Sequence, residues 1–218
     1  MQSLREVYER QARSAGGPEH WSGPPQMVER IAVVLRTSAW HRVLDVGCGL
    51  GGPARRLAVV AGCRVTAVDA VESVVRIASD RTDGAVRYVV ADAGVLPFGD
   101  RTFDQVWSLG AVAHFPRLGR FASECARVLA RGGGAAITEA FWDGRSEPRF
   151  VHTAPRPWRP VTVAETARVL RAAGLGDVAV LPWPGQGPAG ERPPANPELA
   201  ADLADGRLVS GLVVARRT

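Results

Sequence analysis

Lysine is absent from this sequence, because all 27 basic residues of the 218-residue chain are arginine. Together with abundant alanine, glycine, proline and valine, this bias is typical of a protein encoded by a GC-rich genome. The formal net charge is +5. However, the arginines are scattered along the chain and form no basic run, so the charge does not predict a nucleic-acid partner.

Cysteine is scarce, and long apolar runs are missing. The three cysteines form no CxxC pair and are an odd number, which argues against a disulfide framework. The four histidines show no ligand spacing, so we expect no metal site. No apolar run approaches the roughly 20 residues that span a bilayer, and the N-terminal stretch is charged and amphipathic, unlike a signal peptide. We therefore expect a cytoplasmic protein with no membrane partner.

What the sequence does contain is an alternation of apolar strands and amphipathic helices. It predicts a single α/β domain with a doubly wound, seven-stranded, mostly parallel sheet of Rossmann-like type, in which one strand near the edge is reversed. We expect residues 1–40 to form an N-terminal helical lid and residues 41–218 the core. Residues 141–160 are expected to form a short substrate loop without a helix. The expected helices before the sheet cover residues 3–13 and 24–36. The expected strands cover residues 42–47, 64–70, 86–92, 103–110, 133–141, 177–183 and 207–217, with no helix between the last two.

The run VLDVGCGLGG, at residues 43–52, carries the first chemical signal. Gly47, Gly49 and Gly52 fit G-x-G-x-x-G directly after a strand and before a helix, where the backbone can approach a ligand closely. Dinucleotide enzymes share this pattern. Asp45 suits a cationic or amine-bearing ligand better than a pyrophosphate, which it would repel. The alternative is that Asp45 only caps the helix that follows.

Two further acids follow the next two strands. Asp69 ends the second strand, at the spacing from the glycine loop at which a carboxylate can accept the hydroxyl protons of a ribose. Asp92 ends the third strand, where it could accept a hydrogen bond from an adenine amino group. Acids at the carboxyl ends of three successive strands predict a ligand site at that edge of the sheet.

Four segments, VLDVGCGLGG, VTAVDA, VVADAGVLPF and FDQVWSLGAVAHFP, resemble in this order the motifs of class I S-adenosylmethionine (SAM)-dependent methyltransferases. The likeness is greatest to the ubiquinone/menaquinone-type and natural-product small-molecule subgroup, and it covers about residues 42–140. It implies SAM as cofactor and methyl transfer to a small-molecule acceptor in secondary metabolism.

The resemblance also implies the roles of individual residues. Tyr8 and Trp21 are candidates for the lid over the cofactor. The cofactor-binding residues would be Asp45 with the backbone of Gly47, Cys48, Gly49 and Gly51 for the methionine end, Asp69 and Ala70 for the ribose, Asp92 with Ala93 for the adenine, and Leu109 for the sulfonium side.

His114, just after the fourth strand, is the candidate catalytic base. An unperturbed histidine pKa near 6.5 suits general-base work. The alternative is a structural or cofactor-contacting histidine, and many relatives have a second histidine where this chain has Ala113. Glu139 and His152 are lesser candidates: Glu139 could orient a substrate or cap the strand edge, and His152 could simply face solvent.

The segment at residues 141–160 combines aromatic rings with arginines, which suits an acidic or aromatic small molecule. The alternative is an exposed loop without such a role. So short a cap is compatible with an open pocket, a large or carrier-bound substrate, or a lid from a partner subunit. The residues concerned are Trp142, Arg145, Arg149, Phe150, Arg156, Trp158 and Arg159.

Three other functions compete with methylation of a small molecule. A relative of the same fold could use bound SAM without redox chemistry for a cyclisation or another non-methylating reaction, and the cofactor motifs would then be identical. An NAD-dependent oxidoreductase is disfavoured by Asp45 and Asp92. Methylation of nucleic-acid bases is disfavoured because SLGA, at residues 108–111, replaces the usual Asn/Asp-Pro-Pro-aromatic run.

Overall fold

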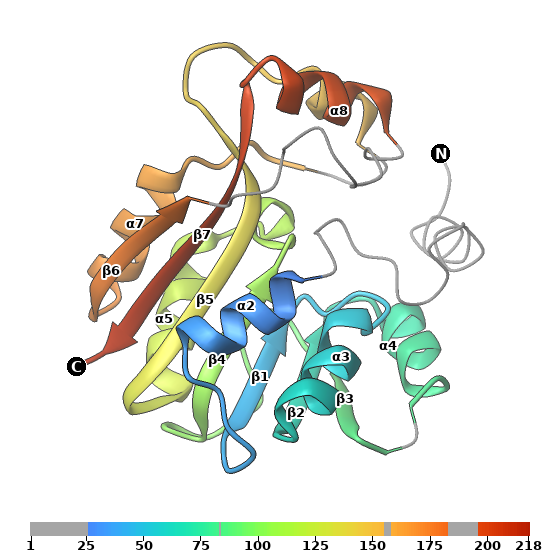
Figure 1. Cartoon of the computed structure of the whole chain (residues 1–218), viewed down its shortest axis with the longest axis vertical. Coiled ribbons are helices and arrows are strands. Elements are labelled where there is room, and N and C mark those ends of the chain that lie inside the picture. The colour runs from blue at the N-terminus through green and yellow to red at the C-terminus, as the bar shows by residue number, and fades with distance from the viewer. Residues whose placement is uncertain (1–25, 83, 155–157, 183–195) are drawn as a thin grey trace.

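The chain forms a central sheet of seven strands with helices on both faces (Figure 1), in a computed structural model that describes residues 26–82, 84–154, 158–182 and 196–218. The strand order is β3-β2-β1-β4-β5-β7-β6, and β7 runs antiparallel to both of its neighbours while the remaining pairs are parallel. The predicted doubly wound sheet with one reversed strand near its edge is confirmed. The strands are β1 (Arg42–Val46), β2 (Arg64–Asp69), β3 (Val86–Val90), β4 (Phe103–Leu109), β5 (Leu129–Trp142), β6 (Leu175–Pro182) and β7 (Leu208–Arg217).

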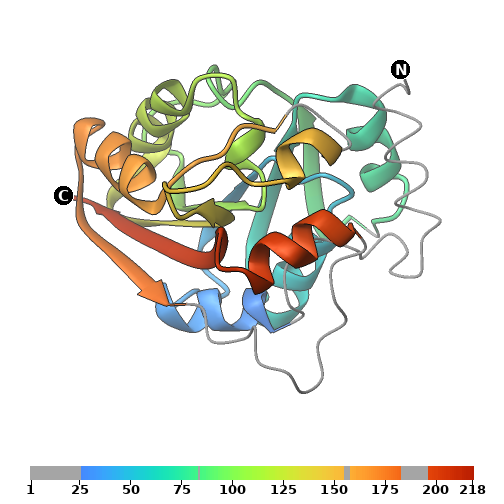
Figure 2. The ribbon, with the colours of Figure 1, turned by 90° about the horizontal axis from the view of Figure 1, so that it is seen from above.

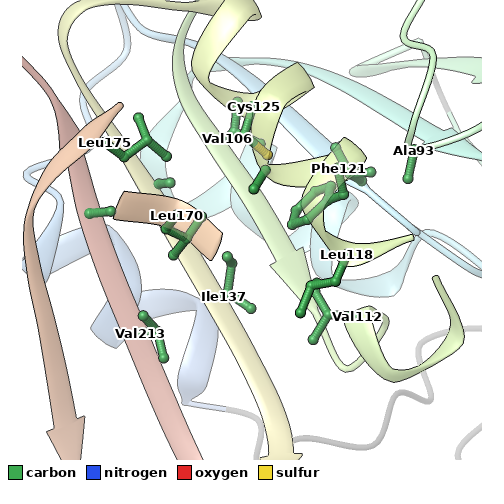
Figure 3. Packing of buried hydrophobic residues seen from close by; sticks show 14 of the residues in the cluster. Ala93, Val106, Val112, Leu118, Phe121, Cys125, Ile137, Leu170, Leu175 and Val213 are labelled. Carbon is green, nitrogen blue, oxygen red and sulfur yellow. The ribbon is translucent and has the colours of Figure 1, made fainter. Parts of the chain in front are cut away.

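Two hydrophobic layers hold the helices to the sheet. Side chains of successive strand residues point to opposite faces, so Val106 joins the layer beneath α5 and α7 while its neighbour Trp107 joins the layer beneath α2 and α3. Figure 3 shows the first layer, where Phe121 of α5 and Leu170 of α7 pack near Ile137 of β5. The helical elements are α2 (Met27–Val34), α3 (Gly52–Ala61), α4 (Glu72–Ser79), the 3-10 turn η2 (Val112–His114), α5 (Leu118–Val128), α6 (Phe150–Thr153), α7 (Val163–Ala172) and α8 (Pro197–Ala204).

Three local expectations are wrong. The helix α8 separates β6 from β7, and it crosses above the sheet (Figure 2). Its start carries a signal in the sequence, because the Asn196 side chain accepts the N–H groups of Glu198 and Leu199 and a proline follows at the first helical position. The segment 141–160 contains the short helix α6. Strand β5 begins at Leu129, before the expected residue 133, because β5 pairs with β4 from that point.

The expected helical lid at residues 1–40 lies largely outside the described residues, as do Tyr8, Trp21 and the helix expected at 3–13. Its described part, α2, packs on the sheet, where Met27 and Ile31 are buried in the same layer as Trp107. Among the described residues, no helix is long and apolar enough to cross a membrane.

Candidate functional site

The glycine loop between β1 and α3 is folded tightly against the neighbouring elements. The backbone N–H groups of Gly47 and Cys48 both donate to the Val68 carbonyl oxygen, at 2.8 and 2.9 Å. Gly47 has φ +78°, and a Cβ there would lie 2.5 Å from the Cβ of Ala111. Only glycine combines this backbone conformation with so close an approach. Glycine at position 47 is therefore required for the loop to pack against β2 and Ala111.

Asp45 is the least satisfied acid of this edge. Its side chain is only 3% exposed, and its Oδ2 atom is buried with no hydrogen-bond partner among the described residues. Burial, and secondarily the negative charge of Asp69, raise its pKa to about 7. The alternative that Asp45 caps the next helix is wrong, because the N-cap of α3 is Gly51 and no side chain accepts a hydrogen bond there. A buried carboxylate oxygen without a partner fits a cationic ligand group.

Asp69 lies at the carboxyl end of β2, next to the glycine loop. Its Oδ2 accepts the Gly49 N–H and its Oδ1 accepts the Val71 N–H, each at 3.0 Å. Each carboxylate oxygen retains a further acceptor position, so both hydroxyls of a ribose could still donate to it. Burial raises the pKa of Asp69, while hydrogen bonds from the backbone of Val71, Gly49 and Ala70 and the charge of His114 oppose that rise.

The other predicted cofactor contacts lie at the same edge. The Asp92 carboxylate follows β3 and is exposed, and its Oδ1 accepts the Gly94 N–H at 2.6 Å. Ala93 and Leu109 are 9% and 8% exposed and belong to the two hydrophobic layers on opposite faces of the sheet. Ala70 is exposed directly after β2. Their individual roles toward a cofactor remain predictions.

The turn η2 carries His114 and is held from two sides at Ala113. The Ala113 N–H donates to Glu139 Oε2 at 3.2 Å, and the Ala113 carbonyl accepts the Arg159 N–H at 2.8 Å. The half-buried His114 thus sits where β5 and the segment 141–160 converge. Because its charge lowers the pKa of Asp69, its imidazole lies within electrostatic reach of the predicted ribose site.

Glu139 is a second titratable group near His114, because its carboxylate holds the turn η2. Its Oε1 accepts the N–H of Ala140 at 3.0 Å, in addition to the contact with Ala113. Burial raises the pKa of Glu139 to about 7, although both backbone N–H groups favour the ionised form. His152, by contrast, is exposed on the short helix α6.

Two of the four arginines of the segment 141–160, Arg149 and Arg159, form ion pairs within the protein. Arg149 pairs with Asp205 at 2.7 Å, and the buried Asp202 of α8 accepts the Phe150 N–H at 2.9 Å, which ties α6 to α8. Arg159 pairs with Glu165. These ion pairs weaken the case for an acidic substrate.

The aromatic side chains of the same segment make contacts within the protein. Trp158 packs against the core and meets the Phe150 ring edge-on, with ring centroids 5.2 Å apart. The indole N–H of Trp142 donates to the Ser146 carbonyl at 2.8 Å. Arg145 is exposed, and Arg156 lies outside the described residues.

Replacing Asp69 by Ala should weaken SAM binding at least about tenfold. The change removes two charge-assisted hydrogen bonds to the ribose, each worth roughly 1.5–3 kcal/mol when desolvated. Calorimetry measures the affinity, and the far-UV spectrum should stay unchanged. Asp104→Ala is the matched control, since Asp104 lies near the amino end of β4 and pairs with Arg42. Unaltered affinity in the Asp69 variant would reject the assignment.

The comparisons with known proteins agree with this geometry. Residues 44–137 match the family model described as a methyltransferase domain. Methyltransferase GfsG of Streptomyces halstedii is 37% identical over 119 residues, which are 52% of this chain and 43% of that protein. The 27-O-demethylrifamycin SV methyltransferase of Amycolatopsis mediterranei is 38% identical over 117 residues, 51% of this chain and 43% of that protein. The chain thus spans less than half the length of these curated relatives.

Solved structures share the fold along most of the chain. The geranyl diphosphate C-methyltransferase of Streptomyces coelicolor superposes with a TM-score of 0.73 at 18% identity, covering 88% of this chain and 78% of that one. The [4+2]-cyclase SpnF superposes with a TM-score of 0.73 at 23% identity, covering 98% of this chain and 93% of that one. At these identities the likeness shows the fold alone.

Proposed function

Because residues 44–137 match the model of a methyltransferase domain, we propose that this chain is a class I SAM-dependent methyltransferase that transfers a methyl group from SAM to a small-molecule acceptor in natural-product biosynthesis. The observation that carries the proposal is the Oδ2 atom of Asp45 beside the glycine loop, which is buried and has no hydrogen-bond partner within the part of the chain that the structure describes. An ammonium group is the partner that such an oxygen lacks, and the amino-acid end of SAM carries one.

The residues of the carboxyl edge fit the rest of the cofactor. Asp69 would hold the ribose, Asp92 and Ala93 the adenine, and the carbonyl region of Leu109 the sulfonium side. SAM, when bound, supplies an electrophilic methyl group on its sulfonium. The protein then has to align the acceptor with that methyl group and exclude water.

On the acceptor side, we propose that His114 takes up the proton of a hydroxyl or another proton-bearing nucleophile. Its turn is fixed by Glu139 and by Arg159 through Ala113, so β5 and the segment 141–160 both set its position. With Arg149 and Arg159 paired to acids, the acceptor favoured is neutral and largely apolar, free or bound to a carrier. The names of relatives point the same way, since they are methyltransferases of a rifamycin, of sterols and of a hydroquinone.

The non-methylating alternative is not favoured. The sequence relatives are methyltransferases, whereas the cyclase resembles this chain in fold only. Product mass separates the two reactions, because methyl transfer adds one methylene to the acceptor and a cyclisation leaves its mass unchanged.

The test is mass spectrometry of incubations with SAM and a panel of hydroquinones, polyketide alcohols and sterols. The expected result is an acceptor heavier by one methylene, with an equal amount of S-adenosylhomocysteine. An isomerised acceptor without mass gain would favour the alternative. Absence of SAM binding would overturn the proposal.

A further inference from the structure

Helix α8 is held to the protein by a charged residue. Its two leucines, Leu199 and Leu203, lie four positions apart on one face, a pattern that a helix ordinarily buries. Yet both leucines are only half-buried, whereas Asp202 is buried and 0% exposed. A carboxylate is almost never fully buried unless other groups pair with it. The contacts of Asp202 therefore decide where α8 lies.

The Asp202 carboxylate connects α8 to α6. Its Oδ2 accepts the N–H of Phe150, the first residue of α6, at 2.9 Å. Its Oδ1 has no hydrogen-bond partner among the described residues, and the guanidinium groups of Arg149 and Arg207 lie 3.9 and 4.0 Å from it. Arg149 also pairs with Asp205 at 2.7 Å. Two arginines thus balance two aspartates, and the hydrogen bond of the buried carboxylate goes to α6.

Phe150 links α6 to the turn η2. The helix α6 has four residues, too few to be stable without contacts from outside. The Phe150 ring meets Trp158 edge-on, and Trp158 packs against the core layer beneath α5 and α7. The next residue, Arg159, donates its N–H to the Ala113 carbonyl of η2 at 2.8 Å. A continuous series of contacts therefore runs from α8 through α6 to η2.

These contacts lie at the edge of the sheet that holds the candidate site. The helices α6 and α8 lie above the carboxyl ends of the parallel strands (yellow and red in Figure 2), and η2 directly follows β4. The rings of Phe115, Phe150 and Trp158 are each half-buried, so each presents part of its apolar surface. An apolar acceptor is bound chiefly by contacts with such rings. Of the three, Phe150 is the one whose backbone Asp202 holds.

Resting on the proposed methyl transfer to an apolar acceptor, we propose that Asp202 is a positioning residue for that acceptor. By holding the Phe150 N–H, it fixes α6 so that the rings of Phe150 and Trp158 form one wall of the acceptor site beside η2. This wall sets how tightly the acceptor binds and leaves the cofactor contacts at the glycine loop unchanged. If Asp202 were merely structural, its loss would lower stability and leave acceptor binding as it is.

The kinetic test uses the acceptor identified by mass spectrometry. Asp202→Ala should raise the KM for the acceptor about tenfold, because a hydrogen bond to a charged group is lost. Both kcat and the SAM affinity should stay within about twofold of the wild type. Asp202→Asn should recover most of the loss, since its amide oxygen can accept the Phe150 N–H. Asp205→Asn is the matched control, because its ion pair with Arg149 is partly exposed and worth little, so its KM should change less than about twofold.

A double-mutant cycle tests the route through Phe150. Phe150→Ala should raise the KM for the acceptor by itself, because the ring that forms the wall is removed. Asp202→Ala should then add nothing in the double variant, since it acts through that ring. Additive effects would show that Asp202 acts by another route and would overturn the proposal.

Hydrogen exchange tests the anchor without any acceptor. The Ala154 N–H donates to the Phe150 carbonyl within α6 at 2.8 Å, and the Thr166 N–H donates to the Thr162 carbonyl at the start of α7 at 3.1 Å. In Asp202→Ala, exchange at Ala154 should be at least about tenfold faster, whereas exchange at Thr166 should be unchanged. Equal exchange at Ala154 in the variant and the wild type would overturn the proposal.

The remaining outcomes separate this proposal from the proposed function. An unchanged KM in Phe150→Ala would overturn the role of Asp202 even if Asp202→Ala did not fold. A loss in Asp202→Asn as large as in Asp202→Ala would overturn it too, because the hydrogen bond would then not matter. Failure of the wild type to bind SAM would reject the proposed function itself, whereas methyl transfer with an unchanged KM in the variants would reject only the role of Asp202.

Discussion

Asp45→Asn should weaken SAM binding by about 100-fold or more. Removing one partner of a buried charge pair costs ~3 kcal/mol or more, because the other charge is left buried and uncompensated. The Asp45 side chain is 3% exposed, so water cannot take over the lost contact. Calorimetry with SAM at pH 8 measures the effect, and Asp104→Asn near the amino end of β4 is the control. Retained affinity would remove Asp45 from the cofactor site.

The same substitution should stabilise the cofactor-free protein at high pH. The pKa of Asp45 is about 7 in the fold, whereas that of an unperturbed aspartic acid is 3.8. Between these values the folded state binds more protons than the unfolded state, so the free energy of unfolding falls as pH rises from about 4 to 7. The amide of the Asp45→Asn variant cannot ionise, so the variant avoids this loss. Because the buried amide is itself imperfectly hydrogen-bonded, we expect a net gain in the free energy of unfolding of ~2 kcal/mol.

Urea unfolding at two pH values tests the sign of this effect. The stability gain of Asp45→Asn over the wild type should be larger at pH 8 than at pH 5. SAM affinity of the wild type should fall below pH 7, approaching tenfold per pH unit, because the protonated acid cannot pair with the ammonium group. The variant should lack this slope. A stability gain that is the same at both pH values would contradict the raised pKa.

His114→Ala should lower kcat by roughly 10²–10⁴-fold with the acceptor identified by mass spectrometry, since this is the contribution of a general base. SAM affinity should change little. The kcat of the wild type should rise with pH between about pH 6 and 7.5 as the base loses its proton, and the variant should lack this rise. Near-normal kcat would make His114 a packing residue, and lost SAM binding would make it a cofactor contact.

Glu139 could produce the same pH dependence of kcat as His114, because both groups would titrate near pH 7. The variant Glu139→Gln therefore has to be measured in the same experiment. Burial raises the pKa of Glu139 to about 7, inside the same window. The glutamine oxygen can still accept the Ala113 N–H, so the turn that carries His114 keeps its anchor. If the rise of kcat between about pH 6 and 7.5 is lost in Glu139→Gln but not in His114→Ala, the proton transfer would be assigned to Glu139.

Local sequence signals determined much of the fold and the outline of the site. The apolar run of β1, the glycines after it and the capping box of α7 act over a few residues, so they can be recognised without the fold. At the start of α7, for example, the Thr162 hydroxyl accepts the N–H of Glu165, a residue only three positions further along the chain. The carboxyl ends of parallel strands meet at one edge, which is why three acids far apart in the chain could be assigned to one site.

Only the tertiary structure decided which of these groups is left unsatisfied and what supports them. That Asp45 has a buried oxygen without a partner among the described residues, whereas Asp69 accepts two N–H groups, depends on how β1, β2 and the loop pack together. The Tyr88 hydroxyl contacts Arg55 and the Gly51 carbonyl, which lie 33 and 37 positions earlier in the chain. The ion pairs of the segment 141–160 with α8 likewise join distant residues. Such contacts carry no local periodicity or spacing, because folding alone brings their partners together.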